Sequence, residues 1–313
     1  MQFKWRERYI VNKRNEKMRR TNDFIKVTNM KVFANHGVLE EEKMNGQDFF
    51  LNAKVYIDMR MAGLTDELER SVNYDMICIY LAEVFCENQY DTIEAAAEYT
   101  VQEIMVNFPK IQAMELEVRK PHAPLTYVPE DISVTIYREW HPVYLSFGSN
   151  MGDSLGYLNE AIINMKDPYA IRYIKCSELF ETKPYGPVKQ NDFLNGCLEM
   201  ETYMDPEELV NFIHQVEDYF ERDRSIHWGP RPVDFDIIFY DDWIYNSKTL
   251  TIPHADMENR MFVLEPLSQL CPGRRHPVWG KTVAQMKKEL EEKIGDADVI
   301  RKSEKKLRVS EGY

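Results

Sequence analysis

The sequence has few cysteines, and their spacing suits neither a metal site nor a disulfide framework. Five cysteines are scattered over 313 residues, and no two of them form a C-x-x-C pair. An odd, scattered set is typical of reduced thiols that pack as small hydrophobic side chains. We therefore expect neither disulfide bonds nor bound zinc. The five are Cys78, Cys86, Cys176, Cys197 and Cys271.

The sequence also lacks a long apolar segment. No run approaches the roughly 20 apolar residues of a membrane helix, and the first residues do not contain the apolar core of a signal peptide. The net charge of −13 argues against nucleic acid as the main partner, because a phosphate backbone requires a basic surface. These absences predict a cytoplasmic protein that binds neither membranes nor nucleic acid.

Residues 1–22 are the exception to this acidic character. They contain eight Lys or Arg and two Glu, a net charge of +6, so the remaining residues carry −19. A basic arm for nucleic acid or membranes is one interpretation, but a single basic run is weak support for it. We prefer a disordered extension, or residues upstream of a start at Met18.

The length favours two domains, and the first is predicted to span residues 23–140. Residues 49–59 alternate between apolar and polar side chains, as a half-buried strand does, and 114–118 and 132–136 repeat that period. A further strand is expected at 24–33. Residues 74–86 and 92–108 have helical spacing. The order predicts an α+β domain with two helices on one face of an antiparallel sheet.

A second domain is predicted at 141–286, followed by a charged C-terminal tail at 287–313. Its expected strands are 143–147, 171–180, 193–201 and 233–240, with helices at 154–165 and 206–221. Asp205 and Glu208 have the spacing of a capping box, and Pro206 suits the first helical position. This order is typical of a ferredoxin-like α+β sandwich with long loops.

The segment WGPRPVDFDI (228–237) contains the most informative polar pair. Asp234 and Asp236 are two residues apart in a strand, so both carboxylates point to one face. Such a pair suits Mg²⁺ together with phosphate oxygens and water. A solvated edge strand would give the same alternation, and the pair by itself is a weak signal.

Cationic residues surround this pair in the sequence. Arg222, Arg224 and Arg231 precede or flank it, and His254 and Arg260 follow. Guanidinium groups beside paired carboxylates suit a site for a polyphosphate. Because the chain has neither a Walker A loop nor a G-x-G-x-x-G turn, we expect side chains to bind the phosphates.

Residues 141–280 resemble 6-hydroxymethyl-7,8-dihydropterin pyrophosphokinases. The resemblance rests on five motifs in the family's order: FGSNMGD (147–153), TKPYGP (182–187), DFLNG (192–196), WGPRPVDFDI (228–237) and IPHADMENR (252–260). This chain differs from the usual family sequence at two positions. Lys183 follows the loop threonine, and His227 lies in a short loop where arginine is common. These differences bear on loop closure and leave the reaction unchanged.

The resemblance implies a role for each of several residues. Asp234 and Asp236 would bind two Mg²⁺ ions, and Arg222 and Arg231 would act on the phosphates during catalysis. Phe193 and Phe262 would hold the pterin ring between them, and Asn195 would bind its edge, as suits a flat heteroaromatic. Thr182 and Tyr185 complete the implied pterin site. The implied ATP contacts are Glu217, Arg224, Trp228, Ile237, His254 and Arg260.

Four polar residues of the first domain are candidates, and each has an ordinary structural explanation. Glu94 follows Asp91 at capping-box spacing. Tyr74 could pack as part of an amphipathic helix, Glu42 lies in a charged run, and Lys120 ends a strand. From the residues alone, each of the four could have either a structural or a catalytic role.

Residues 23–140 resemble dihydroneopterin aldolases, in the motifs NHGVLEEEKMNGQ (35–47), VNYDMI (72–77), TIEAAAE (92–98) and VRKPHAP (118–124). The resemblance implies that Glu94 binds the pterin and that Tyr74, Lys120 and Glu42 act on its side chain. It implies no metal and no Schiff base, because the ring is the electron sink. Ala95 and Ala96 are smaller than is usual and would loosen the pocket.

The two resemblances together imply consecutive steps of folate biosynthesis. Dihydroneopterin would be cleaved to 6-hydroxymethyl-7,8-dihydropterin and glycolaldehyde, and the pterin would then accept pyrophosphate from Mg·ATP, releasing AMP. The first domain would have the tunnelling fold, which closes into a barrel only in a homo-oligomer and takes its tyrosine from a neighbouring subunit. The alternative is an active kinase half beside an aldolase-like half that serves as an oligomerisation scaffold or an epimerase.

Overall fold

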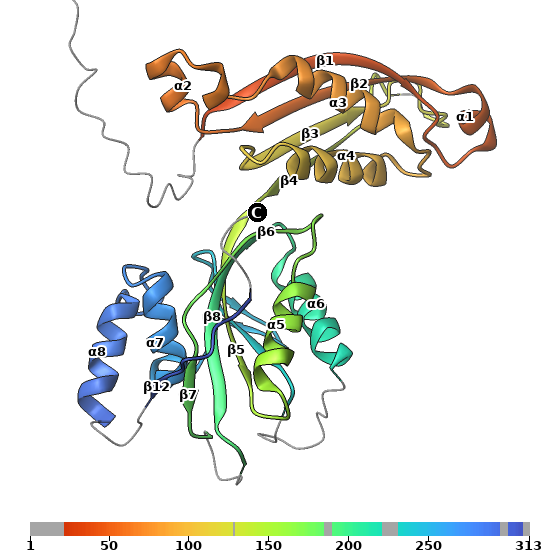
Figure 1. Cartoon of the computed structure of the whole chain (residues 1–313). Coiled ribbons are helices and arrows are strands. Elements are labelled where there is room, and N and C mark those ends of the chain that lie inside the picture. Colours follow the sequence, from red (N-terminus) through yellow and green to blue (C-terminus); the bar gives the residue numbers. More distant parts are fainter. Residues whose placement is uncertain (1–21, 128, 185–189, 221–230, 295–299, 309–313) are drawn as a thin grey trace, which may run out of the picture. The chain divides into compact units, whose positions relative to one another are not determined.

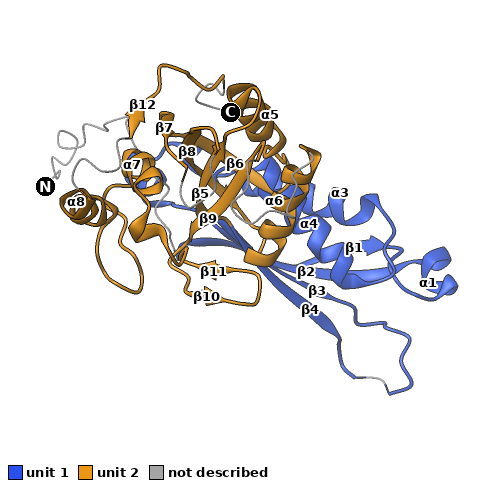
Figure 2. Cartoon of the chain, turned by 90° about the horizontal axis from the view of Figure 1, so that it is seen from below, with its two compact units in different colours: residues 1–139 blue, residues 140–313 orange. Residues whose placement is uncertain are grey.

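The computed structural model describes residues 22–127, 129–184, 190–220, 231–294 and 300–308. The chain divides into two compact units, residues 1–139 and 140–313 (Figure 2). In the described part of the chain, no helix is long and apolar enough to cross a membrane.

Unit 1 is built on a four-stranded antiparallel sheet with the order β1-β2-β3-β4. Helices α3 and α4 lie against this sheet (Figure 1). The strands are β1 (Phe24–Ala34), β2 (Gln47–Tyr56), β3 (Ala113–Arg119) and β4 (Ser133–Glu139), and the helices are α1 (Glu40–Asn45), α2 (Arg60–Thr65), α3 (Tyr74–Glu87) and α4 (Ile93–Asn107), with a 3-10 turn at Leu68–Arg70.

The two faces of this sheet differ because side chains alternate along each strand. Phe49, Leu51 and Val55 of β2 are completely buried on the face that packs beneath the helices. The opposite face is polar: Lys54 Nζ lies 2.7 Å from Glu115 Oε1, and Asn52 Nδ2 donates to Glu117 Oε2 at 2.7 Å. The helices are therefore fixed to one face only.

Unit 2 has a sheet with the order β12-β7-β8-β5-β9, and β6 also pairs with β8. Helices α5 and α6 cover one face, and α7 and α8 cover the other (Figure 1). The strands are β5 (His141–Ser149), β6 (Ile171–Cys176), β7 (Phe180–Thr182), β8 (Phe193–Thr202), β9 (Asp234–Tyr240) and β12 (Arg301–Lys302), with a separate hairpin of β10 (Tyr245–Asn246) and β11 (Thr251–Ile252). The helices are α5 (Ser154–Asn164), α6 (Pro206–Tyr219), α7 (Met261–Leu270) and α8 (Val283–Ile294), with a 3-10 turn at Met257–Asn259.

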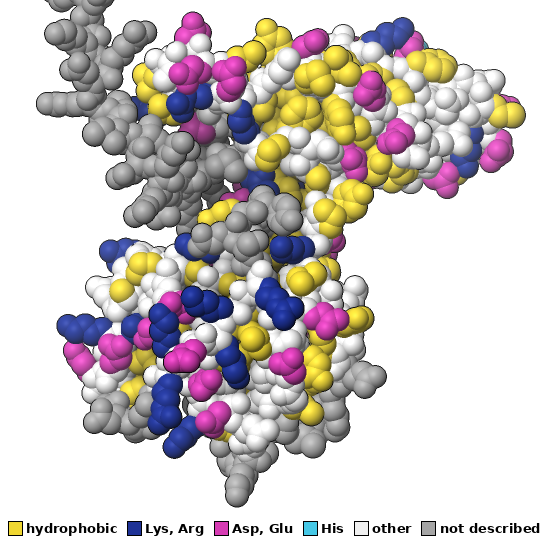
Figure 3. All heavy atoms as spheres, in the orientation of Figure 1, with side chains coloured by type: hydrophobic (Ala, Val, Ile, Leu, Met, Phe, Trp, Pro, Cys, Tyr) yellow, Lys and Arg dark blue, Asp and Glu magenta, His cyan; other side chains and the backbone are white. Residues whose placement is uncertain are grey.

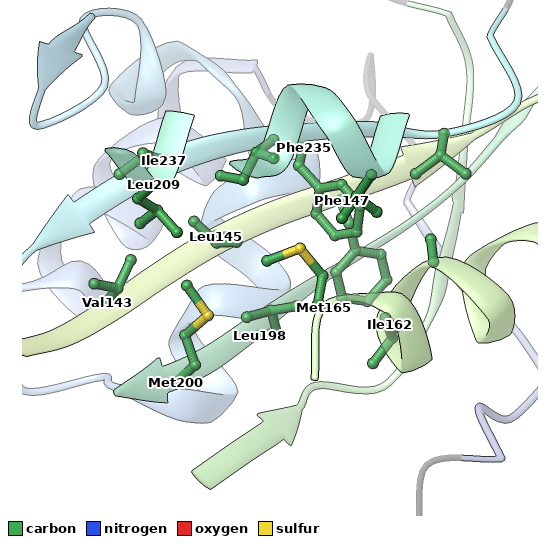
Figure 4. Packing of buried hydrophobic residues seen from close by; sticks show 14 of the residues in the cluster. Val143, Leu145, Phe147, Ile162, Met165, Leu198, Met200, Leu209, Phe235 and Ile237 are labelled. Atoms are coloured by element: carbon green, nitrogen blue, oxygen red, sulfur yellow. The ribbon is translucent and has the colours of Figure 1, made fainter. Parts of the chain in front are cut away.

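Each face of this sheet has its own hydrophobic core. Val143, Leu145 and Phe147 of β5 face the core under α5 and α6, where Leu198 and Ile237 join them (Figure 4). Side chains of opposite parity, such as Tyr144, Cys197 and Ile238, face the core under α7 and α8. Two packed faces fix the register of the central strands, because a slip of one residue would exchange the cores.

Two segments differ from the sequence expectation. The strand predicted at 171–180 is divided into β6, which ends at Cys176, and β7, which begins at Phe180. Strand β6 itself contains a register shift between Arg172 and Lys175, with Tyr173 at a φ of 54°. The predicted tail boundary at 286/287 falls inside α8, where Val283, Met286 and Leu290 are buried in the second core. As far as residue 294, the charged segment is therefore a packed helix.

Candidate active sites

A cavity in unit 2 lies at the ends of β5, β8 and β9, on the sheet face that α7 covers. Asp234 and Asp236 face it, whereas Phe235 and Ile237 point into the core under α5 and α6. The alternation along β9 thus separates the carboxylates from the core side chains. The cavity is lined by Ser146, Phe147, Gly148, Thr182, Lys183, Gln190, Phe193, Asn195, Arg231, Asp234, Asp236, Arg260 and Phe262.

Gly148 allows the floor of this cavity to form. It pairs with Asn195 on one neighbouring strand and with Asp234 on the other. A Cβ atom at this position would lie 2.4 Å from Asn195 Oδ1, so a larger residue would displace that side chain. Asn195 is buried, and its Nδ2 donates to Thr182 Oγ1 at 2.6 Å. A short hydrogen bond to β7 thereby fixes the orientation of the amide.

Two aromatic rings and two guanidinium groups line the same cavity. Arg231 Cζ lies 6.0 Å from the centre of the Phe193 ring, and Arg260 Cζ lies 5.8 Å from the centre of the Phe262 ring. Phe193 belongs to β8, whereas Arg260 and Phe262 lie at the start of α7. A planar ligand and an anionic second ligand would find matching surfaces here.

The paired carboxylates are partly neutralised by cations. Arg231 donates to Asp234 Oδ1 at 3.1 Å, and Arg260 lies 3.6 Å from Asp236 Oδ2. His254 Nε2 lies 4.0 Å from the same oxygen, and burial lowers the pKa of His254. Within the described residues, the buried Arg231 Nε has no hydrogen-bond partner, so the guanidinium group has a donor left for a ligand.

The donor set fits a magnesium ion that shares its ligands with a substrate. Asp234 and Asp236 offer carboxylate oxygens, and their side chains are 16% and 37% exposed. Among the residues that the structure describes, no group of three or more His, Cys, Asp or Glu could hold a metal ion. A metal here would therefore need water or phosphate oxygens to complete its shell, as Mg²⁺ commonly does.

Two residues expected to contact ATP lie behind the cavity. Glu217 of α6 is completely buried, and its Oε1 accepts from the backbone N–H of Phe235 at 2.9 Å. Because β9 is at the edge of the sheet, this carboxylate satisfies a backbone donor between the two aspartates. The side chain of Ile237 belongs to the core, which leaves only its backbone for a ligand. Tyr185, Arg222, Arg224 and Trp228 lie outside the described residues.

Asn150 was missed from the sequence, although it lies in the motif FGSNMGD. It is buried, and its Oδ1 accepts from the backbone N–H of Arg231 at 2.9 Å. Its Nδ2 donates to Gln190 Oε1, also at 2.9 Å. This side chain joins the end of β5 to the segment before β9 and to the loop before β8. A polar residue directly after a buried strand was the available signal.

In unit 1, Lys120 and Glu42 form a nearly buried ion pair. Lys120 Nζ lies 2.6 Å from Glu42 Oε1, and the side chains are 11% and 9% exposed. Glu42 also accepts from Leu39 N and from Gln47 Nε2. Burial would raise the pKa of Glu42, but the hydrogen bonds from Lys120, Leu39 and Gln47 outweigh it and lower that pKa. Glu42 is therefore ionised at neutral pH.

His36 and Gly37 support this pair. His36 is completely buried; its Nδ1 accepts from Tyr90 N at 3.2 Å, so its Nε2 donates to the carbonyl of Phe85 at 2.8 Å. Its own carbonyl accepts from Lys120 Nζ at 3.4 Å. Gly37 has a φ of 154°, and a Cβ there would lie 2.4 Å from the carboxyl carbon of Glu42. The glycine therefore makes room for the ion pair.

Glu94 does not cap its helix. Thr92 is the N-cap residue, and its side chain accepts from Ala95 N, while Asp91 forms an ion pair with Lys43 at 2.8 Å. The capping-box explanation for Glu94 is therefore wrong. Glu94 is exposed, and within the described residues no hydrogen bond or ion pair joins it to another side chain. The loop before α4 contacts the Lys120 region, because Gly37 N donates to the carbonyl of Tyr90 at 3.0 Å.

Tyr74 lies at the other end of α3 from the ion pair. It is the first residue of the helix and is 66% exposed, whereas Phe85, which contacts His36, is near the last. Eleven residues of helix correspond to roughly 16 Å. The described contacts of one chain thus bring Lys120 and Glu42 together and leave Tyr74 apart.

Two family models match the chain, one in each unit. Residues 25–137 match the family described as dihydroneopterin aldolase. Residues 144–272 match 7,8-dihydro-6-hydroxymethylpterin-pyrophosphokinase. The folds and both resemblances predicted from the sequence are thereby confirmed: a tunnelling-fold domain precedes a ferredoxin-like domain.

Three curated relatives cover different parts of the chain. The 2-amino-4-hydroxy-6-hydroxymethyldihydropteridine pyrophosphokinase of Aquifex aeolicus is 37% identical over 147 residues, 47% of this chain and 91% of that protein. The bifunctional protein FolKE of Lactococcus lactis subsp. lactis is 49% identical over 127 residues, 41% of this chain and 36% of that protein. The folic acid synthesis protein fol1 of Schizosaccharomyces pombe is 30% identical over 272 residues, 76% of this chain and 36% of that protein.

The fold and the family matches define a two-domain α+β protein in which each unit matches a different enzyme family. The chain belongs to the 7,8-dihydro-6-hydroxymethylpterin-pyrophosphokinase family, and it contains a dihydroneopterin aldolase domain in the same polypeptide. It spans about a third of the length of FolKE and of fol1.

Proposed function

We propose that the chain catalyses two consecutive reactions of folate biosynthesis, in which the product of unit 1 is the substrate of unit 2. The observation that carries this proposal is the cavity of unit 2, which combines two aromatic rings and a buried amide with paired carboxylates and guanidinium groups. That combination suits a flat heterocycle beside a polyphosphate.

In unit 2, Phe193 and Phe262 would hold the pterin ring, and Asn195 would bind its edge. Arg231, Arg260 and His254 would bind ATP phosphates, together with Arg222 and Arg224. The hydroxymethyl oxygen attacks the β-phosphorus, the bond to the α-phosphate oxygen breaks, and AMP leaves. Arg231 is suited to stabilise the charge that develops, because its guanidinium group is fixed against Asp234 and has a donor to spare.

Asp234 and Asp236 would hold Mg²⁺, in the number of two ions that the family resemblance implies. When bound, Mg²⁺ would neutralise phosphate oxygens next to the reacting phosphorus. The chain's own contribution is to place both carboxylates on one face of β9. Glu217 does this indirectly, since it fixes the backbone between them. Glu217 is thus better described as a positioning residue than as an ATP contact.

In unit 1, Glu94 would accept two hydrogen bonds from the guanidine-like edge of dihydroneopterin. Its exposure, and the absence of a partner for it in the described residues, leave both oxygens available for a ligand. Lys120, which forms an ion pair with Glu42, would take part in moving the proton from the side-chain hydroxyl to the enol-like carbon. No Schiff base is required, because the ring accepts the electron pair.

A homo-oligomer would complete this site. Tyr74 is exposed at the far end of α3, as expected of a residue that serves a neighbouring subunit. Strands β1 and β4 are the two edges of the unit 1 sheet, and an unpaired edge strand is a surface for further pairing. Hydrophobic side chains gather over the helices of unit 1 (Figure 3), and Met76 and Ile79 of α3 are among the exposed ones.

A coupled assay tests both reactions. Dihydroneopterin and Mg·ATP are supplied to the full chain, and glycolaldehyde, AMP and the pterin pyrophosphate are measured. We expect all three products, with AMP dependent on prior release of glycolaldehyde. AMP from added 6-hydroxymethyl-7,8-dihydropterin, without cleavage of dihydroneopterin, would instead favour unit 1 as a scaffold. Conversion of dihydroneopterin to its epimer without glycolaldehyde would favour an epimerase.

A further inference from the structure

Residues 300–308 form a segment, here called the C-terminal strap, that lies beyond the matched family region of 144–272. The strap adds strand β12 to the sheet of unit 2. Arg301 and Lys302 pair with Glu181 and Phe180 of β7, and Ser303 N donates to the carbonyl of Leu179 at 2.8 Å. The strap thus continues the backbone ladder past β7.

Both ends of the strap are anchored, and they are anchored to different cores. Ile300 packs against the core under α7 and α8, whereas Leu307 packs against the core under α5 and α6. Arg308 N donates to Oδ1 of the buried Asn159 of α5 at 2.6 Å. The strap therefore crosses the sheet edge from one layer to the other, with β7 beneath it.

Ser303 lies at the middle of this crossing. Its side chain is buried, and its Oγ donates to Glu181 Oε1 at 3.0 Å while accepting from Lys305 N at 3.3 Å. The hydroxyl group thus has partners for its donor and its acceptor functions, one in β7 and one in the strap. Ser303 is the side chain through which the strap holds β7.

Strand β7 leads directly into the cavity. It has only three residues, Phe180–Thr182, and apart from β12 its ladder is with β8 alone. Glu181 faces the strap, and Thr182, the next residue, contacts Asn195 and lines the cavity with Lys183. A strand this short, paired on one side only, would be weakly fixed, whereas two partners make it an internal strand.

We propose that the C-terminal strap is a positioning element for the pterin site, with Ser303 as the residue that sets β7 and hence the Thr182–Asn195 pair. This inference rests on the proposed pyrophosphokinase reaction. The phosphate-binding groups Arg231, His254 and Arg260 lie on other segments, so the strap acts on the pterin more than on ATP. Weakening the strap therefore raises the KM for the pterin and leaves the KM for ATP unchanged.

The test uses the full chain with Ser303→Ala, and with Ser303→Ala combined with Leu307→Ser. Glu304→Ala is the matched control, because Glu304 is in the strap, is exposed, and makes no described side-chain contact. KM values for 6-hydroxymethyl-7,8-dihydropterin and for ATP, kcat, and equilibrium binding of the pterin with a non-hydrolysable ATP analogue are measured. The aldolase rate of the same samples reports on the amount of intact protein.

We expect Ser303→Ala to weaken pterin binding by up to roughly fivefold, the value reached when the loss of one hydrogen bond is transmitted fully to the site, and the double variant to weaken it further. Glu304→Ala should match the parent chain. Lower melting temperature with an unchanged pterin KM would overturn the inference and leave the strap a purely stabilising element. A parent chain that forms no pterin pyrophosphate would instead refute the proposed function.

Discussion

The two sites of this chain differ in how much of each one polypeptide assembles. In unit 2, strands β7, β8 and β9 and the start of α7 bring carboxylates, guanidinium groups and aromatic rings to one cavity. In unit 1, the same chain brings Lys120 and Glu42 to 2.6 Å but leaves Tyr74 at the far end of a helix. A ferredoxin-like sandwich covers both faces of its sheet, whereas the unit 1 sheet has one polar face and, among the described residues, β1 and β4 as edge strands. We infer that the unit 2 site is self-sufficient within one chain and that the unit 1 site needs further copies.

The largest effect is expected from substitutions in the self-sufficient site of unit 2. Asp234→Ala and Asp236→Ala should each lower AMP formation by at least roughly a hundredfold, because each removes a carboxylate that we propose to bind Mg²⁺ beside the phosphates. Glycolaldehyde release, measured in the same samples, should not change. Asp242→Ala is the matched control, since that carboxylate is 82% exposed, follows β9 by two residues and pairs with Arg274, and neither residue lines the cavity. Near-normal AMP formation by both aspartate variants would remove them as metal ligands.

The next largest effects are expected in unit 1, where one substitution should affect turnover and another should affect substrate binding. Lys120→Ala should lower kcat of the aldolase reaction about a hundredfold, as expected for a group that assists proton transfer. Glu94→Ala should mainly raise KM, because a charged hydrogen-bonded contact is lost from ground state and transition state alike. Steady-state kinetics on dihydroneopterin distinguish the two. Small and equal changes in kcat and KM would indicate that Lys120 and Glu94 have only structural roles.

Many features of the two units could be predicted from the sequence, because they depend on local residue patterns. Alternation along β2 and the stripes of α3 and α4 predicted the sheet and its helices. The capping box of Asp205 and Glu208 is present, with both reciprocal hydrogen bonds at 2.8 Å. Asp234 and Asp236 lie on one face of β9, as their spacing indicated. In these segments the local signal and the tertiary structure agree.

Other features depend on contacts between distant residues, and no local pattern shows them. Thr92 rather than Asp91 is the N-cap residue of α4, and Asp91 forms an ion pair with Lys43. Strand β12 has only two residues and exists because β7 lies beside it. The resemblance implied Glu217 as an ATP contact, and its hydrogen bond from Phe235 N depends on β9 being an edge strand. Such pairings are set by tertiary context, which outweighs intrinsic preference.

A mixing experiment sharpens the contrast between the self-sufficient site and the shared one. Chains with Tyr74→Ala are unfolded and refolded together with chains carrying Glu94→Ala. If a site takes its tyrosine from one subunit and its glutamate from another, random assembly makes roughly a quarter of the sites intact. At dihydroneopterin concentrations well below the raised KM of the Glu94→Ala chains, the mixture should therefore be more active than either parent. Pyrophosphokinase activity should be the same in every mixture. Oligomers that form and recover no aldolase activity would place Tyr74 and Glu94 in the site of one subunit.

The smallest effect concerns the charge of Glu42 and its dependence on pH. The pKa of Glu42 is lowered in the folded chain, so the folded state binds its proton less readily than the unfolded state does. Its contribution to stability is therefore complete above the unfolded pKa of about 4.5 and is lost as the pH falls through the lower, folded value.

Denaturant unfolding of the parent chain and of Glu42→Gln, followed from pH 7 downward, measures this contribution. The difference between the two free energies of unfolding should be constant between pH 7 and pH 6 and should shrink below pH 4.5. A difference that stays constant to acid pH would mean that the negative charge of Glu42 is not needed to hold Lys120 in place. Hydrogen bonding by the side chain, which glutamine retains in part, and packing against Gly37 would then be sufficient.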